Sequence, residues 1–294
     1  MLPILNRASG GPVPMVGSSA TYLGLTRSGP GVGPGEPAKY YPTGTRNYVR
    51  IVPADDVQAA AAAMYVKRKG ATRAFVLSDG EPYGDGAAEA FAISAKRLGI
   101  PIVGAGRWNP KARDYRRLAE RVRRTGPDVV YMGGYVFENT PRLIKEVRRV
   151  LPRAQLIGPD GMNQPATVVE GAGDAAENFL ATIAVHPVRA LPPPGRTFAG
   201  QFRRRYTQYP CCYSMFTAQS EQMALDAIAR AGRNRARVMA KLRAAHVKGG
   251  LIGDFTIDRY GDTTLTRIGV YRIVQGTGRF DSSVSPPATL LARR

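Results

Sequence analysis

The sequence has few of the residues that bind metals or act as nucleophiles. It contains 2 histidines, His186 and His246, and 2 cysteines, Cys211 and Cys212. The cysteines are adjacent, and neighbouring residues cannot form an ordinary disulfide without a strained ring. Zinc sites and Cys–His catalytic pairs need several such side chains close together. We therefore expect no metal site, no cofactor and no cysteine-based catalytic centre.

Long apolar runs are also missing. A membrane-spanning helix needs roughly 20 consecutive apolar residues, and no segment approaches that length. The first residues, MLPILNR, show neither a basic segment followed by a long apolar one nor a lipid-attachment cysteine. From the sequence we expect no membrane segment and no signal peptide, and the 44% hydrophobic content is enough for a sizeable core.

Positive charge, in contrast, is abundant. The formal net charge is +20, and 34 of the 42 basic residues are arginine. They are spread along the chain on the polar faces of predicted helices, whereas a nucleic-acid-binding protein concentrates them in one stripe or patch. We interpret most of them as solvated helix faces, and we expect no nucleic-acid partner.

The central part of the chain alternates strand-like and helix-like segments, which predicts a doubly wound parallel sheet and an α/β fold. The predicted strands are residues 48–52, 74–77, 101–105, 129–132, 155–158 and 179–184, and the predicted helices are 57–69, 85–98, 114–125 and 140–151. After a proline run at 192–194 the pattern favours helices at 197–209, 216–231 and 235–245 and strands at 253–257 and 268–274. We expect an exposed loop at 27–44 and a frayed polar tail at 282–294.

Three polar turns each follow a predicted buried strand: SDGEPYGDG at 78–86, YMGGYVFE at 131–138 and IGPDG at 157–161. Ligands of open parallel sheets bind outside the carboxyl ends of the strands. Tyr83, Tyr135 and Asp160 lie in these turns without a strong nucleophile, which favours binding of a small molecule over catalysis. Alternatively, Asp160 serves only the Gly-Pro-Asp-Gly turn, and the two tyrosines are ordinary half-buried side chains.

An ordered set of motifs resembles the leucine/isoleucine/valine-binding proteins, the substrate-binding subunits of ABC importers. It consists of GSSATYLGLT (17–26), YVRIVPADD (48–56), DGEPYGDG (79–86), VVYMGGYVFE (129–138), IGPDG (157–161), EGAGDAAENF (170–179) and IGDFTIDRYGD (252–262). The resemblance implies two doubly wound lobes of the type I periplasmic-binding-protein fold that close on a ligand. It implies residues 1–52 and 188–262 for lobe 1, 53–187 and 263–285 for lobe 2, and a tail at 286–294.

The same resemblance implies seven ligand contacts. Ser19, Ala20 and Thr21 match the segment that holds the ligand's carboxylate and amino group. Asp160 matches the acid that meets the ligand's ammonium, where the family usually has the longer glutamate. The aromatic contacts are Tyr83, Tyr135 and, for the side-chain pocket, Tyr213.

The implied protein is not an enzyme. It captures an amino acid or a related small amide or acid and delivers it to the permease subunits in the membrane, and its location is extracytoplasmic. Family members have a long segment before the part that matches Pro3–Asn6, so we expect an N-terminally truncated chain whose first lobe is incomplete.

Three alternatives remain open. The chain is a ligand-sensing domain of a regulator or receptor with this fold, a truncated fragment without function, or a doubly wound transferase. The transferase is disfavoured because Gly31–Gly35 neither follows a predicted strand nor precedes a predicted helix, as a phosphate-binding glycine loop does.

Overall fold

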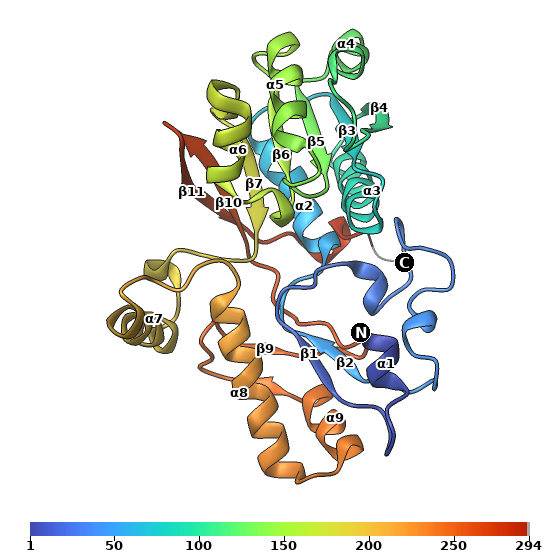
Figure 1. Ribbon diagram of the computed structural model, residues 1–294, viewed down its shortest axis with the longest axis vertical. Coiled ribbons are helices and arrows are strands. Elements are labelled where there is room, and N and C mark those ends of the chain that lie inside the picture. Colours follow the sequence, from blue (N-terminus) through green and yellow to red (C-terminus); the bar gives the residue numbers. More distant parts are fainter. Residues whose placement is uncertain (293–294) are drawn as a thin grey trace. The chain divides into compact units, whose positions relative to one another are not determined.

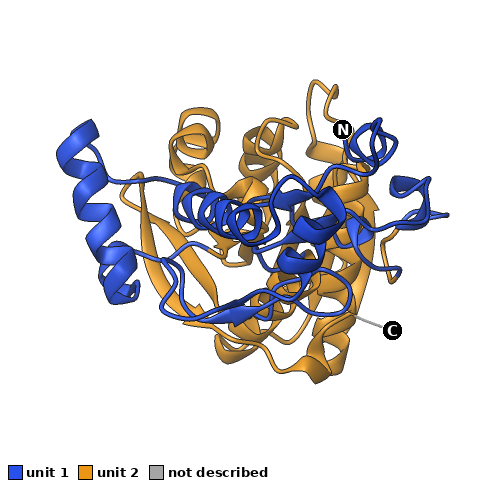
Figure 2. Cartoon of the chain, turned by 90° about the horizontal axis from the view of Figure 1, so that it is seen from below, with its two compact units in different colours: residues 1–28, 33–54, 185–266 blue, residues 29–32, 55–184, 267–294 orange. Residues whose placement is uncertain are grey.

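The computed structural model describes residues 1–292 (Figure 1). The chain forms two compact units, coloured separately in Figure 2. Unit 1 comprises residues 1–28, 33–54 and 185–266, and unit 2 comprises 29–32, 55–184 and the chain from 267 onward. Apart from the short segment 29–32, the chain passes between units after residues 54, 184 and 266. The lobe boundaries predicted from the sequence lie after residues 52, 187 and 262.

Unit 2 is built on a seven-stranded sheet. In sheet order the strands are β11 (Thr277–Val284), β10 (Ile268–Val274), β7 (Leu180–Ile183), β6 (Gln155–Gly158), β5 (Val129–Gly133), β3 (Ala74–Ser78) and β4 (Ile102–Arg107). The five strands from β7 to β4 are parallel, and β10 and β11 join as antiparallel strands. The predicted α/β class with a mostly parallel sheet is confirmed.

Helices cover both faces of this sheet, and alternation along β5 shows which helix lies on which face. Val130 and Met132 belong to an apolar cluster with residues of α4 (Arg116–Arg124), α5 (Thr140–Val150) and α6 (Pro165–Ala172). Tyr131 points the other way and stacks on Phe91 of α3 (Pro82–Arg97) with ring centroids 4.2 Å apart. Helix α2 (Asp55–Arg68) packs beside α3.

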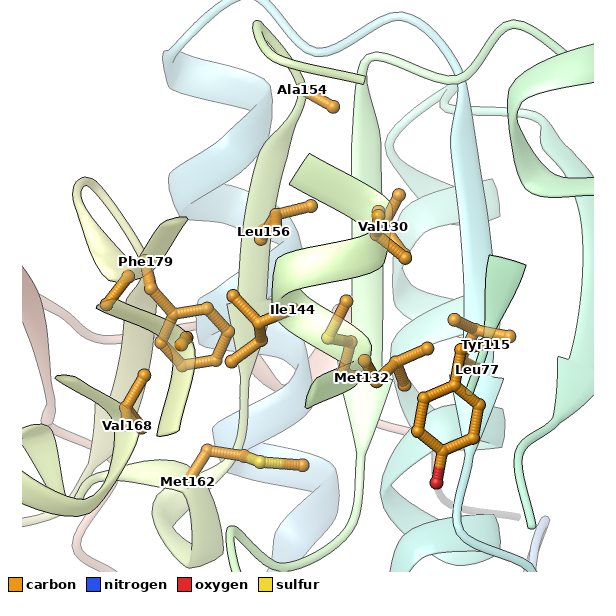
Figure 3. Close-up of a cluster of buried hydrophobic side chains, with 14 of the residues drawn as sticks. Leu77, Tyr115, Val130, Met132, Ile144, Ala154, Leu156, Met162, Val168 and Phe179 are labelled. Atoms are coloured by element: carbon orange, nitrogen blue, oxygen red, sulfur yellow. The ribbon is translucent and has the colours of Figure 1, made fainter. Parts of the chain in front are cut away.

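One apolar cluster of unit 2 lies between the sheet and α4–α6, and the other face of the sheet is buried against α2 and α3. Figure 3 shows Ile144 of α5 between Leu156 of β6 and Met132 of β5. These side chains are fully buried. Burial on both faces explains why the strands are almost continuously apolar in sequence.

Unit 1 contains two small sheets and four α-helices among the described residues. Strands β1 (Met15–Gly17) and β2 (Tyr48–Arg50) pair in parallel, and β8 (His246–Val247) pairs antiparallel with β9 (Phe255–Thr256). The helices are α1 (Leu2–Asn6), α7 (Pro193–Tyr206), α8 (Ser214–Ala231) and α9 (Arg235–Arg243). None of the helices described for residues 1–292 is long and apolar enough to cross a bilayer.

The prediction of a frayed tail at 282–294 is wrong for residues 282–292, the part that the structure describes. Strand β11 continues to Val284, and Leu290, Leu291 and Ala292 are buried. The hydroxyl of Ser94 on α3 donates to the carbonyl of Leu290 at 2.8 Å. The apolar Leu-Leu-Ala sequence therefore packs on unit 2, and residues 293–294 lie outside the described part.

The loop at 27–44 is also less exposed than expected. Glu36 is buried, and its carboxylate accepts hydrogen bonds from the hydroxyls of Tyr22 at 2.6 Å and Tyr40 at 2.7 Å. Tyr41 is buried too, and its hydroxyl donates to the carbonyl of Leu25 at 2.7 Å. Glycine and proline correctly predicted irregular backbone, but side-chain hydrogen bonds pack the part of the loop from Glu36 to Tyr41 within unit 1.

Because Leu291 of the tail is buried, shortening its side chain should measurably lower the stability of the protein. Leu291→Ala is expected to lower the free energy of unfolding by about 2 kcal/mol or more, the usual cost of removing a buried leucine side chain. Phe137→Ala, at an exposed position of the same unit, serves as control and should change it by less than about 0.5 kcal/mol. Urea unfolding followed by circular dichroism measures both, and equal effects would contradict the packed tail.

Candidate functional site

Three turns converge at the carboxyl ends of β3, β5 and β6, which are neighbours in the sheet. The backbone N–H of Asp79, directly after β3, donates to the carbonyl of Gly133 at 3.0 Å. The N–H of Val136, after β5, donates to the carbonyl of Gly161, after β6, at 3.0 Å. The three polar turns identified in the sequence are therefore joined to one another by backbone hydrogen bonds.

Two glycines allow the turns to approach this closely. A Cβ atom on Gly161 would lie 2.8 Å from the carbonyl oxygen of Gly134 and 2.9 Å from the Tyr135 ring. A Cβ atom on Gly84 would lie 2.1 Å from a carboxylate oxygen of Asp79. All three distances are too short for a side chain, so glycine is required at both positions for close packing.

Asp160 lies at the centre of a hydrogen-bond network within unit 2. Its Oδ1 atom accepts from the Tyr83 hydroxyl at 2.5 Å and from Nε2 of Gln58 at 2.9 Å. The Tyr83 hydroxyl in turn accepts from the backbone N–H of Gly161 at 3.0 Å. Hydrogen bonds to an ionised acceptor are the strong ones, so this network fixes one oxygen of the carboxylate.

Gln58 supports Asp160 from helix α2. It is 2% exposed, and its Oε1 accepts from the hydroxyl of Thr182, a fully buried residue of β7, at 3.1 Å. The Thr182 hydroxyl lies 3.3 Å from the carbonyl of Gly158 at the end of β6. Because Thr182 engages the amide oxygen, the NH2 group of Gln58 faces the carboxylate.

Two tyrosine rings lie beside this carboxylate. The Tyr83 and Tyr135 rings are tilted by 30° with centroids 4.5 Å apart, and Tyr83 is buried while Tyr135 is 44% exposed. Burial and then the charge of Asp160 raise the pKa of Tyr83 well above its usual range and that of Tyr135 to about 12. Both phenols are therefore neutral hydrogen-bonding groups at neutral pH, and neither acts as a base.

Asp79 holds the first two turns in place. It is 5% exposed, and its carboxylate accepts from the N–H of Glu81 at 3.0 Å and from the N–H of Tyr135 at 3.2 Å. Burial raises the pKa of Asp79 to about 6, although the two backbone hydrogen bonds work in the opposite direction. The hydroxyl of Thr140, at the start of α5, adds a bond of 2.7 Å to the carbonyl of Tyr135.

The predicted contacts Ser19, Ala20 and Thr21 form a turn after β1 in unit 1. Ser19 and Ala20 are exposed, and Thr21 is buried. The carbonyl of Ala20 accepts from the guanidinium of Arg50 at 3.2 Å. This guanidinium is fully buried and also donates to the carbonyl of Tyr22, the hydroxyl of Thr26 and, at 2.8 Å, the carboxylate of Asp262.

Asp262 is the charge partner of this buried cation. Burial acts to raise its pKa, but the charge of Arg50 and the hydrogen bond from Arg27 outweigh burial and lower it to about 2. The ion pair therefore persists at all physiological pH values.

Tyr213 also belongs to unit 1. It immediately precedes α8, with its ring edge-on to that of Phe216 at 5.5 Å between centroids. The Thr217 hydroxyl of α8 donates to the Ser18 hydroxyl at 3.1 Å. The start of α8 and the turn after β1 are thus connected, so unit 1 gathers four predicted contacts and unit 2 gathers the other three, Tyr83, Tyr135 and Asp160.

Comparison with known proteins now adds to this geometry. The family model described as "Periplasmic binding protein" matches residues 15–278. The chain belongs to this family. Family members are solute-binding proteins, and extracytoplasmic location is typical of the periplasmic binding protein family.

Individual members of the periplasmic binding protein family are similar over most of this chain. An amino acid binding protein of Pseudomonas aeruginosa is 26% identical over 78% of this chain and 60% of its own length. A Leu/Ile/Val-binding protein homolog of Brucella suis is 28% identical over 81% of this chain and 63% of its own length. The chain thus spans less than two thirds of the length of these relatives.

A solved structure shows that the fold agrees with that of the family. The leucine binding protein LivK of Thermotoga maritima superposes with a TM-score of 0.79 at 24% identity, covering 93% of this chain and 73% of the other. The expected type I periplasmic-binding-protein fold is confirmed.

The raised pKa of Asp79 predicts a stability change with pH. Its folded-state pKa of about 6 exceeds the unfolded value of about 3.9, so the folded protein binds more protons in this window. Protonation of Asp79 therefore increases the free energy of unfolding as the pH falls from about 6 to 4, and this increase is lost as the pH rises through 6. Urea unfolding at several pH values should show that Asp79→Asn removes this contribution. Asp114→Asn, at an exposed carboxyl whose pKa is lowered beside Arg116, is the control and should show no change of this sign.

Loss of the buried charge partner is expected to be costly in unit 1. Asp262→Asn leaves the Arg50 guanidinium buried without its anion, which typically costs about 3–5 kcal/mol. Because the pKa of Asp262 is lowered to about 2, the wild-type advantage is complete above about pH 4 and disappears as pH falls through 2. Asp226→Asn, at an exposed carboxylate of α8, is the matched control. A similar small loss in both variants, measured by urea unfolding, would refute the role of the pair.

Proposed function

We propose that this protein is a solute-binding subunit of an ABC importer that captures an amino acid or a related small amide or acid. The observation that carries the proposal is the carboxylate of Asp160, held by two neutral donors beside two tyrosine rings. A carboxylate in such a place suits an ammonium group, because charge-assisted hydrogen bonds offset the loss of water around both ions. The names of the relatives, which bind amino acids, support the same ligand class.

The chemistry of the site supports binding without conversion of the ligand. Catalysis of proton transfer needs an accessible group whose pKa lies near the working pH. The phenols of Tyr83 and Tyr135 titrate far above it, and Asp79, whose pKa of about 6 lies near it, is buried and accepts backbone hydrogen bonds with both carboxylate oxygens. The Tyr83 hydroxyl instead serves as a dipole held between Asp160 and the N–H of Gly161. We therefore propose that the ligand is bound outside the cytoplasm and is released, chemically unchanged, to a membrane permease.

The other predicted contacts give the ligand's carboxylate its partners. In this proposal the exposed backbone of Ser19 and Ala20 and the hydroxyl of Thr21 bind the carboxylate, and Tyr213 lines the side-chain pocket. The side chain of Asp160 is one methylene shorter than the glutamate usual in the resembling proteins. An amide or a larger ligand is therefore as well suited as a branched-chain amino acid.

Titration calorimetry with L-leucine, leucinamide and 4-methylpentanoate, which is leucine without its amino group, tests the proposal. The wild type should bind at least one ammonium-bearing ligand and prefer leucine over 4-methylpentanoate. Asp160→Asn should weaken binding of the ammonium ligands by about 10- to 100-fold, since a hydrogen bond to a charged group contributes about 1.5–3 kcal/mol. It should leave 4-methylpentanoate almost unaffected.

Two further variants sharpen this experiment. Gln58→Leu should weaken the ammonium ligands in the same direction by a smaller factor, because Asp160 keeps its charge and its bond from Tyr83. Asp114→Asn removes an exposed carboxylate elsewhere in unit 2 and should change nothing. Equal binding of leucine and 4-methylpentanoate, unchanged by Asp160→Asn, would contradict the proposed role of Asp160.

A further inference from the structure

The only two cysteines of the sequence are adjacent and lie in the turn before α8. Cys211 and Cys212 are both free thiols, and both are exposed. The candidate ligand network involves neither of them. They therefore form a separate chemical feature, a pair of neighbouring thiols that reagents in solution can reach.

Hydrogen bonds fix the backbone of this turn. The carbonyl of Cys211 accepts from the N–H of Ser214 at 2.9 Å and from its hydroxyl at 2.6 Å. Cys212, the first central residue of the turn, has φ of +48°. That conformation favours glycine, and a cysteine persists in it only where its surroundings impose it.

The two side chains contact each other. A hydrogen bond joins the thiols, and the pKa of Cys212 is raised by desolvation first and then by Cys211. Cys212 is therefore mainly a protonated thiol at neutral pH rather than a reactive thiolate. Both sulfur atoms are available together in one small region of the turn.

The short distance between adjacent residues limits the bonds that the two thiols can form. Adjacent Cα atoms lie about 3.8 Å apart across a trans peptide, below the separation of about 4.4–6.8 Å usual in disulfides. A direct disulfide is therefore strained. Structural zinc needs four protein ligands, and within residues 1–292 no group of three or more His, Cys, Asp or Glu side chains is suited to a metal ion.

A trivalent atom that bonds to only two protein sulfurs avoids the strain of a direct disulfide and does not need the four protein ligands of structural zinc. We propose that Cys211 and Cys212 form a binding site for trivalent organoarsenicals, whose third valence is satisfied by carbon. The arsenic atom bridges the sulfurs, so they need not approach to bonding distance. Cys212 directly precedes Tyr213, the proposed pocket residue, but the reaction of the thiols does not require Asp160, so either proposal can fail without the other.

The reaction is a condensation without electron transfer. With phenylarsine oxide as probe, two As–S bonds form, two S–H bonds break, and the oxide oxygen leaves with both protons as one water molecule. Arsenic stays trivalent and both sulfurs keep their oxidation state. The second As–S bond closes within the chain, so a high effective concentration favours it.

Intact-mass spectrometry of the full chain, reduced beforehand with a phosphine, tests the site. After phenylarsine oxide we expect one phenylarsenic group per chain. Removing it should need a 2-mercaptoethanol concentration on the order of 100-fold higher than for a chain with one cysteine, the lower range of gains from a second linked contact. The dithiol 1,2-ethanedithiol should remove it readily.

Two single-cysteine variants are the matched comparison. Cys212→Gly removes one thiol and places glycine at the positive φ, so the turn is retained. Cys211→Ser removes the other thiol. In both, the adduct should be stripped easily by 2-mercaptoethanol. Equal resistance of the wild type and either variant, or a reduced wild type that takes up no arsenical, would overturn the proposal.

Discussion

A single buried carboxylate, that of Asp79, holds the turns on which the candidate site of unit 2 depends. It accepts from backbone N–H groups on two different turns, and Gly84 must lack a side chain to leave room for it. The second of these turns carries Tyr135, whose ring lies against Tyr83, the donor to Asp160. Without this carboxylate the backbone N–H of Tyr135 would lose its acceptor, and the position of both rings would lose its support.

In unit 1, the buried ion pair between Arg50 and Asp262 holds the turn that carries the predicted ligand contacts. The Arg50 guanidinium joins β2, the segment from Ala20 to Thr26, and Asp262. The opposite pKa shifts of the two acids reflect their surroundings. Asp79 has no cationic partner, and burial, with a smaller contribution from the charges of Glu138 and Glu81, raises its pKa. Asp262 faces two arginines, which lower its pKa. In each unit a predicted ligand segment is thus positioned by a buried polar group that does not belong to it.

Local patterns in the sequence were sufficient to predict much of this architecture. Strand and helix alternation located the parallel sheet, and the turns after three strands brought together Tyr83, Tyr135 and Asp160. Helix α6 was missed because PATVVEGA combines β-branched residues with glycine, which lowers helix propensity. Strand β11 was missed because TGRFDSSV is polar and half exposed. This strand is stabilised by its antiparallel pairing with β10, which the local pattern of residues does not reveal.

The supporting residues were harder to predict than the site itself. Gln58 lies within an alanine-rich helix, where nothing local indicates that its amide faces Asp160, 102 positions along the chain. Arg50 is one of 34 arginines, most of which we interpreted as solvated. Contacts between residues far apart in sequence decide both roles. Charge and pattern alone do not reveal them.

The order of segments in unit 2 has a consequence for the growing chain during synthesis. Strand β7 is made before residues 185–266 of unit 1, and its partner β10 is made only afterwards. Until then β7 is an open sheet edge, the kind of surface on which nascent chains associate wrongly. The strand is four residues long, which limits this exposure. Completion of unit 2 must also wait for Leu290 to Ala292, which are made after β11 and are buried.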